Sequence, residues 1–98
     1  MRENEFRKFL ENAENIDSKD KAVQSRISRA NIAEEIIGIS LDMIVRDDQK
    51  MYDALICIKA DSRERNGNIQ NALRWYYKFV NGKEFPTLIS FKKRSINK

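Results

Sequence analysis

The chain has 98 residues, with 19 Lys and Arg against 15 Asp and Glu and no histidine, so its formal net charge is +4. This length allows one small domain, and 41% hydrophobic with 35% charged residues is typical of a globular protein. The absence of histidine excludes imidazole bases, His-ligated metals and Ser-His or Cys-His nucleophiles. We therefore expect a protein that is not an enzyme and that uses no cofactor.

The single cysteine, Cys57, cannot form an internal disulfide or complete a tetrahedral thiolate site, so no structural metal is expected. It lies between Ile56 and Ile58 and is predicted to be buried as a small hydrophobic residue. No stretch of the sequence approaches the roughly 18 consecutive apolar residues of a membrane-spanning helix. We therefore expect a soluble, cytoplasmic protein that does not enter a membrane.

Two helices are predicted in the first part of the chain, where apolar residues recur every three to four positions. The first spans about residues 2–15. The second spans about residues 18–37 and is the longest, with Asp17 or Ser18 as its N-cap and Gly38 just after its end. The expected core residues are Phe6, Phe9, Leu10 and Ala13 in the first helix and Val23, Ile27, Ala30 and Ile37 in the second.

Residues 39–46 are predicted to form a linker, and two further helices follow it. Asp47 and Asp48 supply a cap and negative charge at the start of the third helix. The fourth helix runs from an N-cap at Asn66 or Asn68 to a stop at Gly82. The expected core residues are Met51, Ala54, Leu55 and Ile58 in the third helix and Ile69, Ala72, Leu73, Trp75, Tyr76, Phe79 and Val80 in the fourth.

The excess positive charge lies at the C-terminal end of the chain. Residues 1–82 contain 14 basic and 14 acidic side chains, whereas residues 83–98 contain 5 basic and 1 acidic. Residues 87–91 are predicted to be a short extended or β-prone run that leads to the basic residues. A basic tail favours an acidic partner, nucleic acid first, and a solvated terminus has the same composition. The cations that would bind such a partner are Lys92, Lys93 and Arg94.

The polar face of the predicted fourth helix has the composition of a surface that contacts DNA. Arg74 and Lys78 can neutralise phosphates, and Gln70 and Asn71 can reach base edges. Tyr77 lies at the border of the apolar arc and is predicted to contact DNA as well. An ordinary solvated helix face has the same composition, and this alternative stays open.

Two other segments carry candidate DNA contacts. The second predicted helix has Lys21, Gln24 and Ser28 on its polar side. The loop at residues 63–68 contains Arg63 and Arg65 and is similar to a phosphate-contacting loop that leads into a helix N-terminus.

Two residues of the second predicted helix have unusual positions. Arg26 falls on the side that is expected to face inward, and it is predicted to extend along apolar surface or to pair with a buried carboxylate. Ile32 is expected on the opposite side, exposed to solvent.

The adjacent carboxylates of the chain have no companion base, so no catalytic residue is assigned.

Two runs of the sequence, DSKDKAVQSRI at residues 17–27 and NIQNALRWYYKF at residues 68–79, resemble the SAM-like core-binding domain of phage integrases and other tyrosine recombinases. The resemblance covers about residues 6–81. It implies a four-helix module that holds one face of duplex DNA through its second and fourth helices. The positions that it implies as contacts are Lys21, Gln24, Ser28, Gln70, Arg74 and Lys78. The residues of the integrase catalytic domain have no counterpart here, so strand cleavage is not expected.

The sequence therefore predicts an all-α protein, with a compact four-helix SAM-like bundle over residues 1–82 and a short extended basic tail over residues 83–98. The predicted function is non-enzymatic binding of double-stranded DNA. The neutral charge of residues 1–82 favours an alternative, a small protein-interaction module that docks on a larger protein, such as a regulator or inhibitor encoded by a phage or a mobile element.

Overall fold

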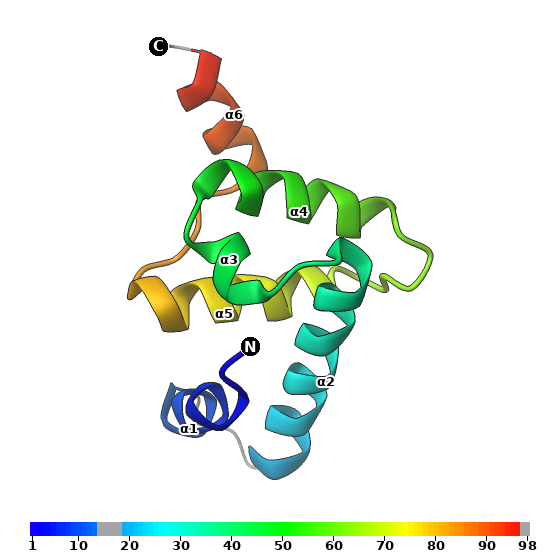
Figure 1. Ribbon diagram of the computed structural model, residues 1–98, viewed down its shortest axis with the longest axis vertical. Helices are drawn as coiled ribbons and strands as arrows, with labels where there is room; N and C mark the ends of the chain where they lie inside the picture. The colour runs from blue at the N-terminus through cyan, green and yellow to red at the C-terminus, as the bar shows by residue number, and fades with distance from the viewer. Residues whose placement is uncertain (14–18, 97–98) are drawn as a thin grey trace.

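Apolar residues at helical spacing produce the helices, and most of the helices bury an apolar face against the others. The computed structural model describes residues 1–13 and 19–96, and the side chains of residues 1–13 and 21–93. Within this part of the chain the structure is all-α and compact, and Figure 1 shows the arrangement of its six helices. They are α1 (Glu3–Ala13), α2 (Lys19–Ile37), α3 (Leu41–Val45), α4 (Asp48–Ala60), α5 (Asn68–Asn81) and α6 (Leu88–Ile96).

The core forms where α2 packs on α5, with α1, α3 and α4 around this pair. Ala30 and Ala33 of α2 and Ala72 of α5 are buried, and small side chains of this kind allow helix axes to approach closely. Most of the predicted core is confirmed. The buried residues include all four that were predicted for α4, two of the four for α1, three of the four for α2 and four of the seven for α5. The buried set is Phe6, Leu10, Val23, Ile27, Ala30, Ala33, Leu41, Ile44, Val45, Met51, Ala54, Leu55, Ile58, Ile69, Ala72, Leu73, Tyr76, Tyr77 and Phe85.

Some residues lie differently from their predicted positions. Ala13 is exposed and is the last residue of α1. Cys57 is also exposed, since α4 buries the face that carries Ala54, Leu55 and Ile58. Ile32 was expected at the surface, but it is half-buried and packs on the core.

The helix ends confirm several sequence signals. Asp47 is the N-cap of α4, and its carboxylate accepts hydrogen bonds from the backbone N–H groups of Gln49 and Lys50. Gly82 ends α5 at φ 73°, a left-handed conformation that glycine adopts without strain. The predicted N-cap of α2, Asp17 or Ser18, lies outside the described residues.

Two segments have helices that the sequence analysis did not predict. The linker at residues 39–46 contains α3, whose N-cap Ser40 accepts a hydrogen bond from the backbone N–H of Asp42. The prediction of an extended tail is wrong, because residues 88–96 form α6. Thr87 starts this helix: its hydroxyl accepts from the backbone N–H of Ser90. Leu88 lies one helical turn before Phe91, and both pack on the core, so tertiary contact outweighs the local β-propensity.

Candidate nucleic-acid interface

A surface pocket of about 390 Å³ follows the exposed side of α5 and is closed by the segment before α6. Three of its residues, Asn71, Arg74 and Lys78, recur at helical spacing and therefore share one face of α5. The lining residues are Asn71, Arg74, Trp75, Lys78, Glu84, Phe85 and Thr87. Glu84 is the sole carboxylate among them, so cations predominate in this pocket.

The indole ring of Trp75 brings two cations from different helices together. The guanidinium carbon of Arg26, on α2, lies 4.9 Å from the ring centroid, and Nζ of Lys78 lies 5.1 Å from it. Cations at this distance are attracted by the electron-rich face of an indole. The prediction that Arg26 faces the interior side of α2 is confirmed, since it lies at the contact between α2 and α5.

Arg74 holds the segment that closes the pocket. Its Nη1 donates hydrogen bonds to the carbonyl oxygens of Phe85, at 3.0 Å, and of Pro86, at 3.2 Å. Burial lowers the pKa of this guanidinium, and the nearby Glu84 opposes that shift. An arginine keeps its charge at neutral pH all the same. Arg74 therefore orders the pocket wall and adds positive charge to it.

Tyr77 does not contribute to this surface. Its side chain is only 2% exposed, and its hydroxyl donates a hydrogen bond of 2.8 Å to Oδ1 of Asp48. The prediction that Tyr77 contacts DNA is therefore wrong. The reason is that Phe85 packs edge-on against its ring and extends the core over a position at the border of the apolar arc.

Glu64 occupies the N-terminus of α5, where a bound phosphate was predicted. Its carboxylate accepts hydrogen bonds from the backbone N–H groups of Ile69, at 2.9 Å, and of Gln70, at 2.8 Å. Burial acts to raise the pKa of Glu64, but these hydrogen bonds outweigh it, and the pKa lies below its usual value. The predicted cap at Asn66 or Asn68 is wrong as well, because Gly67 is the N-cap residue.

The other predicted DNA-contacting residues of this region form contacts within the protein or lie apart from the pocket. The side-chain amide of Gln70 donates a hydrogen bond of 3.2 Å to Glu64. Arg63 forms ion pairs with Asp61 and Glu35, at 3.0 and 3.6 Å. Arg65 is exposed in the same loop. None of these residues lines the α5 pocket.

On α2, Lys21, Gln24 and Ser28 are exposed, as predicted. The side-chain Oε1 of Gln24 accepts a hydrogen bond of 2.9 Å from Nη2 of Arg7 on α1, so this part of α2 contacts α1. None of the three α2 residues lines the α5 pocket, and the two predicted faces therefore do not form one site.

Two of the predicted cations of the tail lie on α6. Lys92 and Lys93 are exposed there. Arg94 belongs to the same helix, but its side chain lies outside the described part of the structure.

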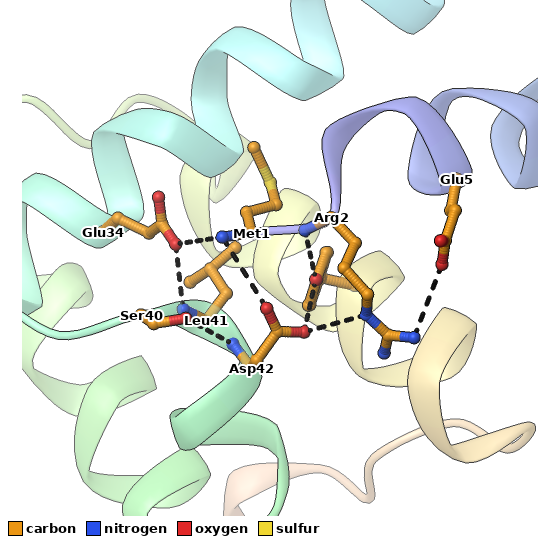
Figure 2. A network of polar contacts seen from close by, with 8 residues as sticks. Met1, Arg2, Glu5, Glu34, Ser40, Leu41 and Asp42 are labelled. Atoms are coloured by element: carbon orange, nitrogen blue, oxygen red, sulfur yellow. Dashed lines mark hydrogen bonds and ion pairs between the residues drawn. The ribbon is translucent and has the colours of Figure 1, made fainter.

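A polar corner near the start of the chain was not predicted from the sequence (Figure 2). The amino group of Met1 lies 3.2 Å from Oε2 of Glu34 and 3.6 Å from Oδ2 of Asp42. Asp42 also accepts a hydrogen bond of 2.6 Å from the hydroxyl of Tyr76, and Nε of Arg2 lies 3.2 Å from the same carboxylate. This network joins α1, α2 and α3 to α5.

The network sets the pKa values of its members. Burial raises the pKa of Asp42, but hydrogen bonds from Tyr76 and Arg2 and the charge of the Met1 amino group outweigh it, so the pKa lies below its usual value. Burial raises the pKa of Tyr76 to about 12, and Asp42 acts in the same direction. The phenol is therefore a stable hydrogen-bond donor at neutral pH.

A second hollow, of about 270 Å³, is mainly apolar and lies between the end of α2, α3 and α4. Ile39 beside it is 38% exposed, and Met43 on α3 is 49% exposed. The lining residues are Ile37, Ile39, Ile44, Lys50, Asp53, Ala54 and Cys57.

No protein-family model, curated protein or solved structure matches this chain. Among the residues that the structure describes, no helix has the length and apolar character needed to cross a membrane. What is shown is thus a small, compact all-α domain with a cationic pocket on α5.

Proposed function

We propose that the protein binds double-stranded DNA without catalysing a reaction on it, and that the α5 pocket is the centre of its contact surface. The observation that carries this proposal is that Arg74 and Lys78 share one face of α5 in a pocket whose lining has Glu84 as its one carboxylate. Lys78 and Arg26 of α2 also lie over the ring of Trp75. Cations on a helix face neutralise DNA phosphates, and these contacts supply most of the sequence-independent affinity.

Two further features support the proposal. Asn71 is exposed at the pocket, where its amide can donate a hydrogen bond to a phosphate or accept and donate at a base edge. The resemblance of residues 17–27 and 68–79 to the integrase core-binding domain also favours DNA, because α5 is the helix that would face the duplex in such a domain.

Replacement of one pocket cation tests the proposal. We expect Lys78→Ala to weaken binding of a fluorescent duplex of about 20 base pairs uniformly across sequences, and to reduce the slope of log K against log salt by about 0.9, which is the loss of one phosphate contact. Fluorescence anisotropy over a salt series gives both values. Trp75 is the single tryptophan of the chain, so its emission reports independently on occupation of the pocket.

Lys59→Ala is the matched control, because Lys59 is exposed in the last turn of α4 and does not line the pocket. It removes the same charge from the molecule and should reduce the affinity far less. Equal losses in the two variants would mean that only net charge matters, which would contradict a defined contact surface on α5.

A protein-interaction module is the second candidate, and the exposed apolar side chains of Ile39 and Met43 favour it. A partner helix with an apolar face is the chemistry that would suit the hollow beside them. This alternative predicts that the protein does not bind duplex DNA even at low salt. The anisotropy titration of the native chain therefore separates the two candidates directly.

A further inference from the structure

The helix α6 is attached to the rest of the protein mainly through one aromatic side chain. The ring of Phe91 stacks on Tyr52 of α4, with centroids 5.1 Å apart, and lies 5.3 Å from the ring of Phe85. Leu88, one turn earlier, is partly buried against the core. Figure 1 shows α6 extending beyond α4, at the opposite end of the molecule from α1.

The rest of the described face of α6 is exposed and cationic. Ile89 is 71% exposed, and Ser90, Lys92 and Lys93 are exposed as well. Neither lysine forms an ion pair with any residue in the described part of the chain. Their charge is thus available to an external anion.

The helix α6 begins directly after a residue of the α5 pocket. Thr87 lines that pocket, and its hydroxyl accepts the hydrogen bond from Ser90 that starts α6. Lys92 and Lys93 follow five and six positions after Thr87, which is about 7.5–9 Å along a helix axis. The two lysines are therefore linked to the pocket wall through the first turns of α6.

We propose that α6 is a rigid arm that presents Lys92 and Lys93 to the phosphate backbone of the same DNA duplex, and that Phe91 is the residue that positions it. This inference rests on the proposed function and adds α6 as a second element that contacts the DNA. Charge complementarity between the two lysines and the polyanionic backbone identifies the occupant of the exposed α6 face.

Phe91 is essential to this arrangement because α6 is too short to be helical alone. A helix of nine residues is marginal in water without tertiary contacts. The stack with Tyr52 and Phe85 therefore holds α6 folded and fixes where its lysines lie. Without the stack, the same charges would be distributed over a flexible segment and would bind with a larger loss of conformational entropy.

The test compares three variants of the full chain in the duplex anisotropy assay. Lys92→Ala with Lys93→Ala should weaken binding roughly 10- to 100-fold and reduce the salt slope by about 1.8, for two phosphate contacts. Phe91→Ala should weaken binding by a smaller factor while all cations are retained, and far-UV circular dichroism should show the loss of α6 alone. Phe91→Tyr keeps the stacked ring and should restore the affinity.

Lys8→Ala with Lys59→Ala is the charge-matched control, since both lysines are exposed on α1 and α4. This control should lose less affinity, relative to the native chain, than the α6 double variant loses. If Lys78→Ala weakens binding and the α6 double variant does not, the arm is refuted and the proposed function stands. If Phe91→Ala melts α6 and the affinity is unchanged, the rigid arm is refuted in favour of a flexible tail. Absence of binding by the native chain refutes both proposals.

Discussion

Tyr76 is the side chain that couples the apolar core to the polar corner. Its ring is fully buried and packs edge-on against Phe6, with centroids 4.9 Å apart. Its hydroxyl donates to Asp42 and accepts a hydrogen bond of 2.9 Å from the backbone N–H of Arg2. One side chain of α5 thus fixes the entry of α1 and the orientation of α3.

Loss of the Tyr76 hydroxyl should destabilise the fold. We expect Tyr76→Phe to lower the free energy of unfolding by about 1–3 kcal/mol, because it removes one hydrogen bond to the Asp42 carboxylate and leaves the backbone N–H of Arg2 without its partner. Urea denaturation followed by circular dichroism measures this difference. Tyr52→Phe is the control, since no hydrogen bond of the Tyr52 hydroxyl to another residue is found in the described structure; a loss of equal size there would contradict the assignment.

The raised pKa of Tyr76 also predicts an alkaline effect. The folded protein holds the phenolic proton up to about pH 12, whereas the unfolded chain releases it near pH 10.0. Between these values the folded state binds more protons than the unfolded state, so the free energy of unfolding falls as the pH rises. Tyr76→Phe should flatten this fall in a series of urea melts. An unchanged alkaline slope in that variant would show that other groups cause it.

Single residues also mark where reasoning from the sequence reaches its limit. The wheel position of Trp75 and Tyr76 correctly predicts a core-facing side for both, yet the partners of Tyr76 lie 34 and 74 positions away and no local pattern indicates them. The predicted exposure of Tyr77 was wrong because a helical wheel takes no account of contacts from other segments. Its burial depends on Phe85, which folds back from beyond the end of α5.

At the scale of the elements, α5 depends on a carboxylate from the preceding loop. Glu64 takes the place of an N-cap side chain because Gly67, in the cap position, has none. A negative group at this end of a helix also interacts favourably with the helix dipole. In the loop that resembles an anion-binding site, the Glu64 carboxylate thus occupies the position of the anion.

Glu64→Ala should therefore lower the free energy of unfolding by about 1 kcal/mol, the usual cost of a lost N-cap. Glu64→Gln keeps one acceptor oxygen and should cost less. Because the folded-state pKa of Glu64 lies below its usual value, the native chain should lose this stabilisation as the pH falls through the acidic range, and the Ala variant should lose less over the same range. Thermal melts from pH 3 to pH 7 test both statements; identical acid profiles for the two proteins would contradict them.

The longer helices follow from periodicity, and the shorter ones do not. The apolar residues of α1, α2, α4 and α5 recur at helical spacing, and in the structure they form the buried face of each helix. The short helix α3 needs Ser40 as a cap and Leu41 and Ile44 as anchors, a signal that is present in the sequence but is brief. For α6 the pattern is ambiguous between strand and helix, and the aromatic stack with Tyr52 decides it.

At the scale of the whole molecule, the formal charge is distributed unevenly along the chain. Residues 1–82 are formally neutral, and part of their charge is used internally, as in the ion pairs of Arg2 with Asp42 and of Arg63 with Asp61. Under the proposed function, the cations that contact DNA lie at the α5 pocket and on α6, which follow one another along the chain. The proposal therefore assigns DNA contact to these two elements and not to the whole surface.

The salt dependence of duplex binding by the native chain tests this account most directly. If the α5 pocket and α6 together neutralise about four phosphates, the slope of log K against log salt should lie near −3.6. The slope should become shallower, about −2.7, when Lys78 is replaced, and it should remain near the native value when Lys59 is replaced. A native protein that does not bind duplex at low salt, or that binds with no dependence on salt, would contradict the account.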